Sequence, residues 1–249
     1  MATATLPKSP AVIRRDYTYD NYFFSAMAVL ILATVFAGFA RTYFLAGVFR
    51  AHLPNLLIHI HGAAFSAWIV LLITQTALVA THRVDIHRKL GLAGFGLAFT
   101  MIVLGVLASA NSLSRDFVPP NSGFDPRTFY VVPVADMLMF TVLIACAYAY
   151  RNTPAAHKRL IVLATIALMD APTGRPPFAI ITNHKAVDSI FEYAFLLLLV
   201  GYDLWSRRKV HRATLWGGLL ILVVTQARVP IGMTRPWLAF AGWVKHLAS

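Results

Sequence analysis

Long, uninterrupted runs of apolar residues recur along this 249-residue chain, and they constrain its fold more than any other feature. An α-helix rises 1.5 Å per residue, so about 20 apolar residues cross a hydrocarbon core that is about 30 Å thick. Because lipid offers no hydrogen-bond partner to the backbone, such runs predict helices. Hydrophobic residues make up 58% of the chain and charged residues 13%, which favours lipid as the main solvent. We therefore predict an all-α, polytopic integral membrane bundle of one domain.

The apolar runs predict about seven transmembrane helices. They divide the chain into an amino-terminal segment, residues 1–21, a membrane domain, residues 22–233, and a carboxyl-terminal segment, residues 234–249. Because Pro172 and Pro176 interrupt the fifth run, we expect that helix to kink or end early. The predicted spans cover about residues 22–47, 56–80, 88–112, 129–150, 158–181, 187–206 and 212–233.

The distribution of basic residues predicts the orientation of the bundle. If the amino terminus is cytoplasmic, 13 of the 22 basic and four of the ten acidic residues lie on the cytoplasmic side. That side then carries about nine positive charges against about three outside, as the positive-inside rule requires. We expect a multi-pass protein of a bacterial inner membrane, surrounded by lipids, with its carboxyl terminus outside. Topology thus explains the net charge of +12, and the short basic clusters form no nucleic-acid-binding stripe.

The most distinctive stretch of the sequence resembles half of the cytochrome b five-sixty-one family. It begins at His61 near the outer end of the second span, continues through Gln75 and a short basic loop, and reaches a helix that opens with His87-Arg88-Lys89-Leu90-Gly91-Leu92. The same stretch is similar to a broad group of uncharacterised bacterial membrane proteins that have a His-Arg-x-Leu-Gly motif. The resemblance covers about residues 56–165.

The resemblance implies four consecutive helices that hold two b haems, each between two histidines. His87 and His157 each open a helix on the cytoplasmic side and match the family's inner pair, whereas the outer histidines face a fourth span that contains no histidine. Neutral imidazoles suit both axial positions of haem iron, and Arg88 and Arg159 would pair with its propionates. Cys146 is the single cysteine, which excludes covalent attachment through two cysteines. The same residues equally suit anchoring at lipid headgroups.

A second group of ionisable residues is predicted in the outer half of the membrane, where such groups are costly unless they face the bundle. They form either an ion-paired network that locks the helices together, a metal or substrate pocket, or a path for ions or protons. In the metal interpretation, zinc, iron or manganese would be held by His61, Asp136, Asp188 and Glu192. The other members of this outer polar network are Arg41, Tyr43, His59, Asp170, Arg175, Gln226 and Arg228.

These patterns lead to one functional hypothesis and two alternatives. The first is a b-type haem protein that passes electrons between a quinol or another small reductant and an acceptor, which would make it a membrane oxidoreductase. The second is a metal-dependent membrane enzyme that acts on a lipid-like substrate in the outer pocket. The third is a structural or accessory subunit without a cofactor. The first predicts a pair of histidines near the cytoplasmic face, and the second predicts a cluster in the outer half.

Overall fold

The structure, a computed structural model, describes residues 10–50, 55–119, 123–175, 178 and 189–248. These residues form helices joined by turns and short connections, with no strand among them. The long helices are α1 (Pro10–Phe39), α3 (Leu56–Ala80), α4 (Val84–Ser114), α6 (Val131–Ala149) and α11 (Arg212–Gly232). A π-helical turn, η1 (Ala40–Phe44), extends α1, and the shorter helices are α2 (Ala46–Phe49), α5 (Pro126–Phe129), α7 (Pro154–Ile166), α8 (Asp170–Thr173), α10 (Ile190–Arg207) and α12 (Arg235–Ala248).

Five helical segments in the described part of the chain are long and apolar enough to cross a membrane. They are Tyr19–Phe44, Leu56–Ala80, Val84–Ser114, Pro126–Ala149 and Arg212–Gly232. Each coincides with a predicted span to within a few residues, because length and hydropathy alone determine where such a run begins and ends. The chain is therefore a membrane-embedded helical bundle.

The two remaining predicted spans, residues 158–181 and 187–206, correspond to shorter helices in the structure. The expected span 158–181 is wrong in its extent, because α7 ends at Ile166 and only the short helix α8 follows before Gly174. At 1.5 Å per residue, the 13 residues of α7 extend about 20 Å, less than the hydrocarbon thickness. The 18 residues of α10 reach about 27 Å and include Glu192 and Asp203. The total of seven spans stays a prediction.

Local sequence signals explain where several helices begin. The side chain of Asn55 caps α3 by accepting a hydrogen bond from the Ile58 backbone N–H at 3.0 Å. Asp125 caps α5 in the same way, and Pro126 follows at the first helical position, where its missing N–H costs no hydrogen bond. These polar caps supply partners for backbone donors that the first turn of a helix leaves unpaired.

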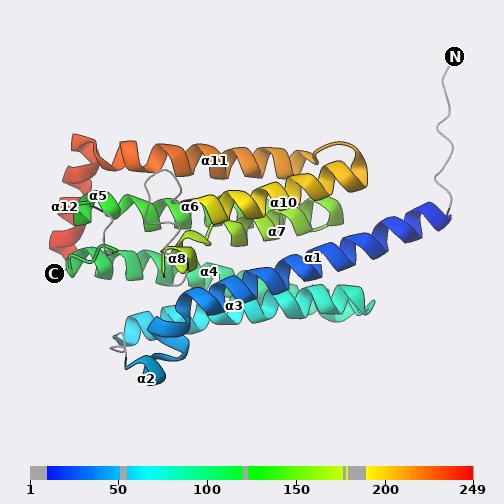
Figure 1. The fold of residues 1–249 in the computed structure, drawn as a ribbon, viewed down its shortest axis with the longest axis horizontal. Helices are drawn as coiled ribbons and strands as arrows, with labels where there is room; N and C mark the ends of the chain where they lie inside the picture. Colours follow the sequence, from blue (N-terminus) through cyan, green and yellow to red (C-terminus); the bar gives the residue numbers. More distant parts are fainter. Residues whose placement is uncertain (1–9, 51–54, 120–122, 176–177, 179–188, 249) are drawn as a thin grey trace, which may run out of the picture.

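The buried core surrounds α6 and α7, which pack against each other and against α11. Phe140 and Leu143 of α6 meet Leu163 and Ile166 of α7 and Ile221 of α11, and each of these side chains is almost completely buried. Helices α3 and α4 form an antiparallel pair, and α1 packs against α3 (Figure 1). Half of the residues in the most apolar stretch of Pro126–Ala149 are buried inside the bundle, so α6 is central.

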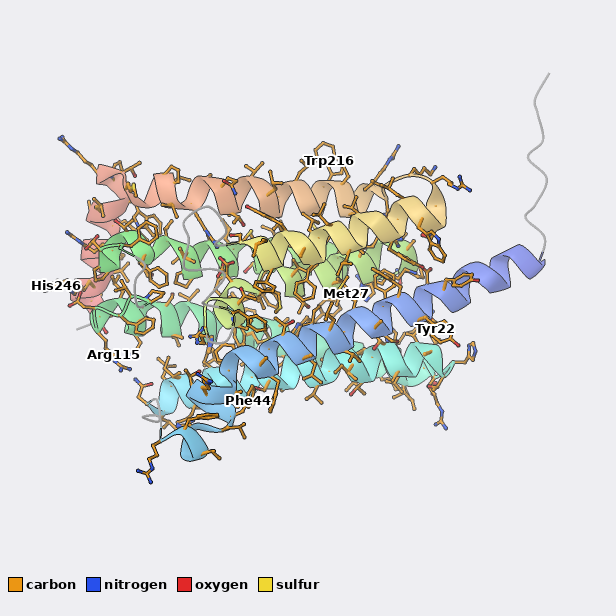
Figure 2. The ribbon with its side chains drawn as sticks, viewed as in Figure 1. Tyr22, Met27, Phe44, Arg115, Trp216 and His246 are labelled. Carbon is orange, nitrogen blue, oxygen red and sulfur yellow. The ribbon has the colours of Figure 1, made fainter. Side chains whose placement is uncertain are left out.

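The outer surface of the bundle carries many large apolar side chains. Figure 2 shows Trp216 pointing outward from α11 and Tyr22 outward from α1, and their exposed fractions are 69% and 71%. Val70, Phe99 and Val223 are also exposed. In water such a surface would aggregate, whereas in a bilayer it faces acyl chains.

The bundle has two distinct ends. Helices α4, α7 and α11 all begin at one end, together with their basic residues, and we call this the basic end (Figure 1). Helix α12 lies across the opposite end, where the Trp237 indole N–H donates to the Arg127 carbonyl oxygen at 2.9 Å and Lys245 pairs with Asp116 at 2.5 Å. The exposed Phe240 and Trp243 give α12 the character of a helix that lies in the membrane interface.

Candidate functional site

The structure brings His87 and His157 together at the basic end. His87 lies in the first turn of α4 and His157 in the first turn of α7, and both helices pack against α6. Their ring centroids are 6.5 Å apart and the ring planes are nearly perpendicular, at 80°. Both side chains are half-buried, and the ring of Phe95 lies 6.3 Å from that of His157. Two residues separated by 70 positions in sequence therefore share one site.

Hydrogen bonds fix one imidazole and leave nitrogen atoms of both available. The His157 Nδ1 atom lies 2.9 Å from the Ala147 carbonyl oxygen, and because a carbonyl only accepts, Nδ1 carries the proton. In the neutral ring Nε2 then keeps its lone pair. The His87 Nδ1 atom is buried and has no hydrogen-bond partner among the described residues. Gln75 donates to the His87 backbone carbonyl at 3.2 Å, so α3 holds the start of α4 in position.

The basic residues next to His157 are already committed to acidic partners. Arg159 is completely buried and donates to the Asp203 Oδ1 atom from Nε at 2.9 Å and from Nη2 at 2.5 Å. Lys158 pairs with Asp20, which also accepts from the Tyr202 hydroxyl at 2.6 Å. Arg88, by contrast, is exposed. Of the two arginines expected to meet haem propionates, Arg159 is therefore paired with Asp203, and within the described structure Arg88 forms no ion pair.

The Asp203 carboxylate also organises the start of α11. Its Oδ2 atom accepts from the Thr214 hydroxyl at 2.6 Å and from the His211 backbone N–H at 3.0 Å. His211 in turn caps α11 through Nδ1, which accepts from the Ala213 N–H at 3.1 Å. Burial, followed by the nearby charges of Arg159 and Arg207, lowers the pKa of His211 below its usual value. These contacts make the basic end a connected polar network.

At the opposite end, Arg228 is the centre of a buried cluster from four helices. Its Nη1 atom donates to the Asp136 Oδ1 atom at 2.9 Å, and Nη2 pairs with Asp170. Glu192, only 1% exposed, accepts from the Thr225 hydroxyl at 3.3 Å. We call Arg228, Asp136, Asp170 and Glu192 the Arg228 cluster. It unites α6, α8, α10 and α11 away from the basic end of the bundle.

The other residues of the predicted outer network lie elsewhere. The Tyr43 hydroxyl donates to the His59 carbonyl oxygen at 3.3 Å, and Gly62 leaves room for the tyrosine ring against α3. His61 stacks on Phe65, with ring centroids 4.1 Å apart. Arg41 is exposed and lies over the Phe49 ring. The expected single network is therefore at least two separate groups, one on η1 and α3 and one around Arg228.

Two further members of the predicted network have partners of their own. The Arg175 guanidinium lies over the Phe39 ring of α1, 4.5 Å from its centroid, and also donates to the Ala171 carbonyl oxygen. Gln226 contacts the Tyr193 hydroxyl between α11 and α10. Arg175 thus connects the segment after α8 to α1, and Gln226 connects α11 to α10.

The proposed metal ligands do not form a metal-binding group in the described part of the chain. No set of three or more histidine, cysteine or acidic side chains there is arranged to hold a metal ion. Asp136 directly contacts a guanidinium, and Glu192 is bonded to a threonine hydroxyl. Asp188 lies outside the described residues. What the described side chains do form is an arginine–carboxylate network.

Sequence reasoning missed the partners that complete both networks. Asp20, Tyr202 and Asp203 lie close to predicted membrane ends, where charged and polar residues are expected, so Asp20 and Tyr202 resemble interfacial residues. Thr225 is an unremarkable residue of an apolar run. The one available signal was the position of Asp203 between apolar neighbours in a predicted span, which indicates an inward-facing acid.

Comparison of the chain with protein-family models, curated proteins and solved structures found no match. The histidine pair and the Arg228 cluster are therefore the features of the molecule that bear on its function.

Proposed function

We propose that this protein is a membrane electron-transfer protein that holds one b-type haem between His87 and His157. Its electron donor would be a quinol or another small reductant of a bacterial inner membrane. The basic end, where the haem would be bound, would face the cytoplasm because positive residues collect on that side of membrane proteins.

One observation carries the proposal, the separation of the two imidazoles. Two axial bonds of about 2 Å on opposite sides of iron set the ligand nitrogens about 4 Å apart, and each nitrogen is about 1 Å from its ring centroid. Centroids are then about 6 Å apart, close to the observed 6.5 Å. Direct packing of aromatic rings also occurs at such distances, so the available nitrogen atoms must support the assignment.

The available nitrogen atoms suit axial ligation. The Ala147 carbonyl oxygen binds Nδ1 of His157, which leaves Nε2 as the ligand and fixes the orientation of the ring. A buried nitrogen without a hydrogen bond, such as His87 Nδ1, is costly and is explained if the imidazole has a partner in the functional protein. When bound, the haem supplies one-electron exchange between ferrous and ferric iron. Arg88, the exposed residue that follows His87, would pair with its propionates.

The metal-enzyme and accessory-subunit hypotheses have less support. Among the described residues, Asp136 pairs with Arg228 and Glu192 accepts a hydrogen bond from Thr225, so these two carboxylates do not point to a common metal position. An accessory role explains the two ion-paired networks but gives no reason for an unpartnered histidine nitrogen at the basic end.

Optical spectroscopy tests the proposal. The protein purified in detergent from cells supplied with haem precursors should give a reduced-minus-oxidised spectrum typical of low-spin b haem. His87→Ala and His157→Ala should each abolish this spectrum. His82→Asn is the matched control, because His82 is an exposed histidine at the same end whose φ of 61° asparagine tolerates. Absence of the spectrum in the unaltered protein, or its persistence in both alanine variants, would contradict the proposal.

A further inference from the structure

The Arg228 cluster has more acidic groups than its one cation balances. Asp136 and Asp170 both contact the guanidinium, and Glu192 is the third carboxyl group. The exposed fractions of the side chains are 10% for Asp136, 13% for Asp170 and 6% for Arg228. Buried charges in a membrane protein require partners, so three ionised carboxylates around one arginine are unfavourable.

In the part of the chain that the structure describes, Glu192 is the carboxyl group of the cluster that forms no ion pair with Arg228. Its side chain is almost completely buried. Among the described residues, its Oε2 atom accepts a hydrogen bond from the neutral Thr225 hydroxyl, and its Oε1 atom has no hydrogen-bond partner. An ionised carboxylate accepts several hydrogen bonds, whereas a protonated one is neutral and tolerates an apolar environment. The Glu192 site thus suits the neutral acid.

The charged groups around Glu192 favour the same state. Asp136 from α6 and Asp170 from α8 repel a negative charge on Glu192, while Arg228 from α11 attracts it but is shared with both aspartates. The first turn of α10, which contains Glu192, also favours a negative charge. One guanidinium and one helix end oppose two carboxylates and burial in the membrane interior. Arg175, which follows α8, lies over the Phe39 ring instead.

We propose that the Arg228 cluster is a proton-binding site in the outer half of the bundle, with Glu192 as the residue that holds an exchangeable proton. Exchange would move the proton from a Glu192 oxygen to the Asp170 carboxylate, whose Oδ1 atom is buried and has no hydrogen-bond partner among the described residues. The O–H bond of Glu192 breaks as that of Asp170 forms, so the cluster keeps its net charge in the internal step. This inference is independent of the haem.

Infrared spectroscopy of the purified protein tests the assignment. At neutral pH the protein should show the carbonyl absorption of a protonated carboxyl group, and this band should shift on transfer to heavy water. Glu192→Gln, which keeps the size of the side chain and an acceptor for Thr225, should remove it. Asp85→Asn is the matched control, because Asp85 is an exposed acid at the basic end, and it should leave the band unchanged.

Two results would overturn the proposal. Absence of the band at neutral pH means that Glu192 is ionised, including the case in which a bound cation balances it. Persistence of the band in Glu192→Gln assigns the proton to another group. If Glu192→Gln does not fold, Thr225→Val is measured in its place. Loss of the hydrogen bond from the Thr225 hydroxyl should shift the carbonyl band of Glu192, and an unshifted band would contradict the assignment.

Discussion

Truncation of Arg159 should destabilise the protein more than any other single change at the basic end. The guanidinium makes three hydrogen bonds, two to Asp203 and one of 2.7 Å to the Ala155 carbonyl oxygen, and neither side chain of the ion pair is exposed. In Arg159→Ala, Asp203 keeps the neutral donors from Thr214 and His211 but loses its guanidinium partner. Stranding a buried charge in this way costs about 3 to 5 kcal/mol in soluble proteins.

For a chain of this size, each kcal/mol shifts the melting temperature by about 2 to 4 °C. Arg159→Ala should therefore melt roughly 6 to 20 °C below the unaltered protein when thermal unfolding in detergent is followed by circular dichroism. Arg207→Ala, at the exposed end of α10, is the matched control and should change the unfolding free energy by less than about 0.5 kcal/mol.

A double variant separates the stranded charge from lost packing. Arg159→Met combined with Asp203→Leu removes both charges and should recover part of the lost stability, although the Thr214 and His211 donors then lack their acceptor. Equal melting temperatures for Arg159→Ala and Arg207→Ala would refute the reasoning, because they would mean that the Arg159–Asp203 pair is accessible to water.

Three further outcomes are expected. Arg228→Ala should lower the melting temperature in detergent by several degrees, because Arg228 is buried and ion-paired, whereas Arg41→Ala should leave it unchanged, because Arg41 is exposed. Equal effects of the two substitutions would contradict the assignment of Arg228 to a buried ion-paired cluster. Because folding lowers the pKa of His211, the unfolded chain binds more protons than the folded protein below pH 6.5. The free energy of unfolding should therefore fall as the pH drops from 7 to 5, and His211→Asn should reduce that loss. An unchanged pH dependence in His211→Asn would contradict the role of His211. A reporter fused after Ser249 should report the outer compartment, and one placed between Asn152 and Ala155 should report the cytoplasm. Reversed signals would overturn the orientation.

The sequence predicts those parts of the fold that depend on hydropathy alone. Leu56–Ala80 and Arg212–Gly232 follow their apolar runs closely, since lipid requires a helix wherever such a run occurs. The fifth run was expected to end early because of its prolines, and α7 does end early, at Ile166. Its exact end was not predictable, because the chain turns after Ile166, before the first proline, where packing against α1 and α10 determines the path.

The sequence predicts the histidine pair more successfully than the polar networks. His87 and His157 both open helices at the same end, so a bundle places them at equal depth, and the structure brings their rings together. The Arg159–Asp203 pair joins residues 44 positions apart, and hydropathy does not say which helix faces meet. For the same reason, residues at similar depth, such as Tyr43 and Arg228, were grouped in one outer network although they lie in separate clusters.

The haem content of the purified protein is the most direct test of the central claim. In the described structure His87 and His157 form the one pair of histidine rings in contact, whereas His59 contacts Tyr43 and His61 contacts Phe65. The proposal therefore predicts one non-covalent haem per chain, extractable with acidified solvent and measured as its pyridine complex. A content of zero after expression with haem precursors would contradict haem binding, and a content of two would contradict the assignment of a single site.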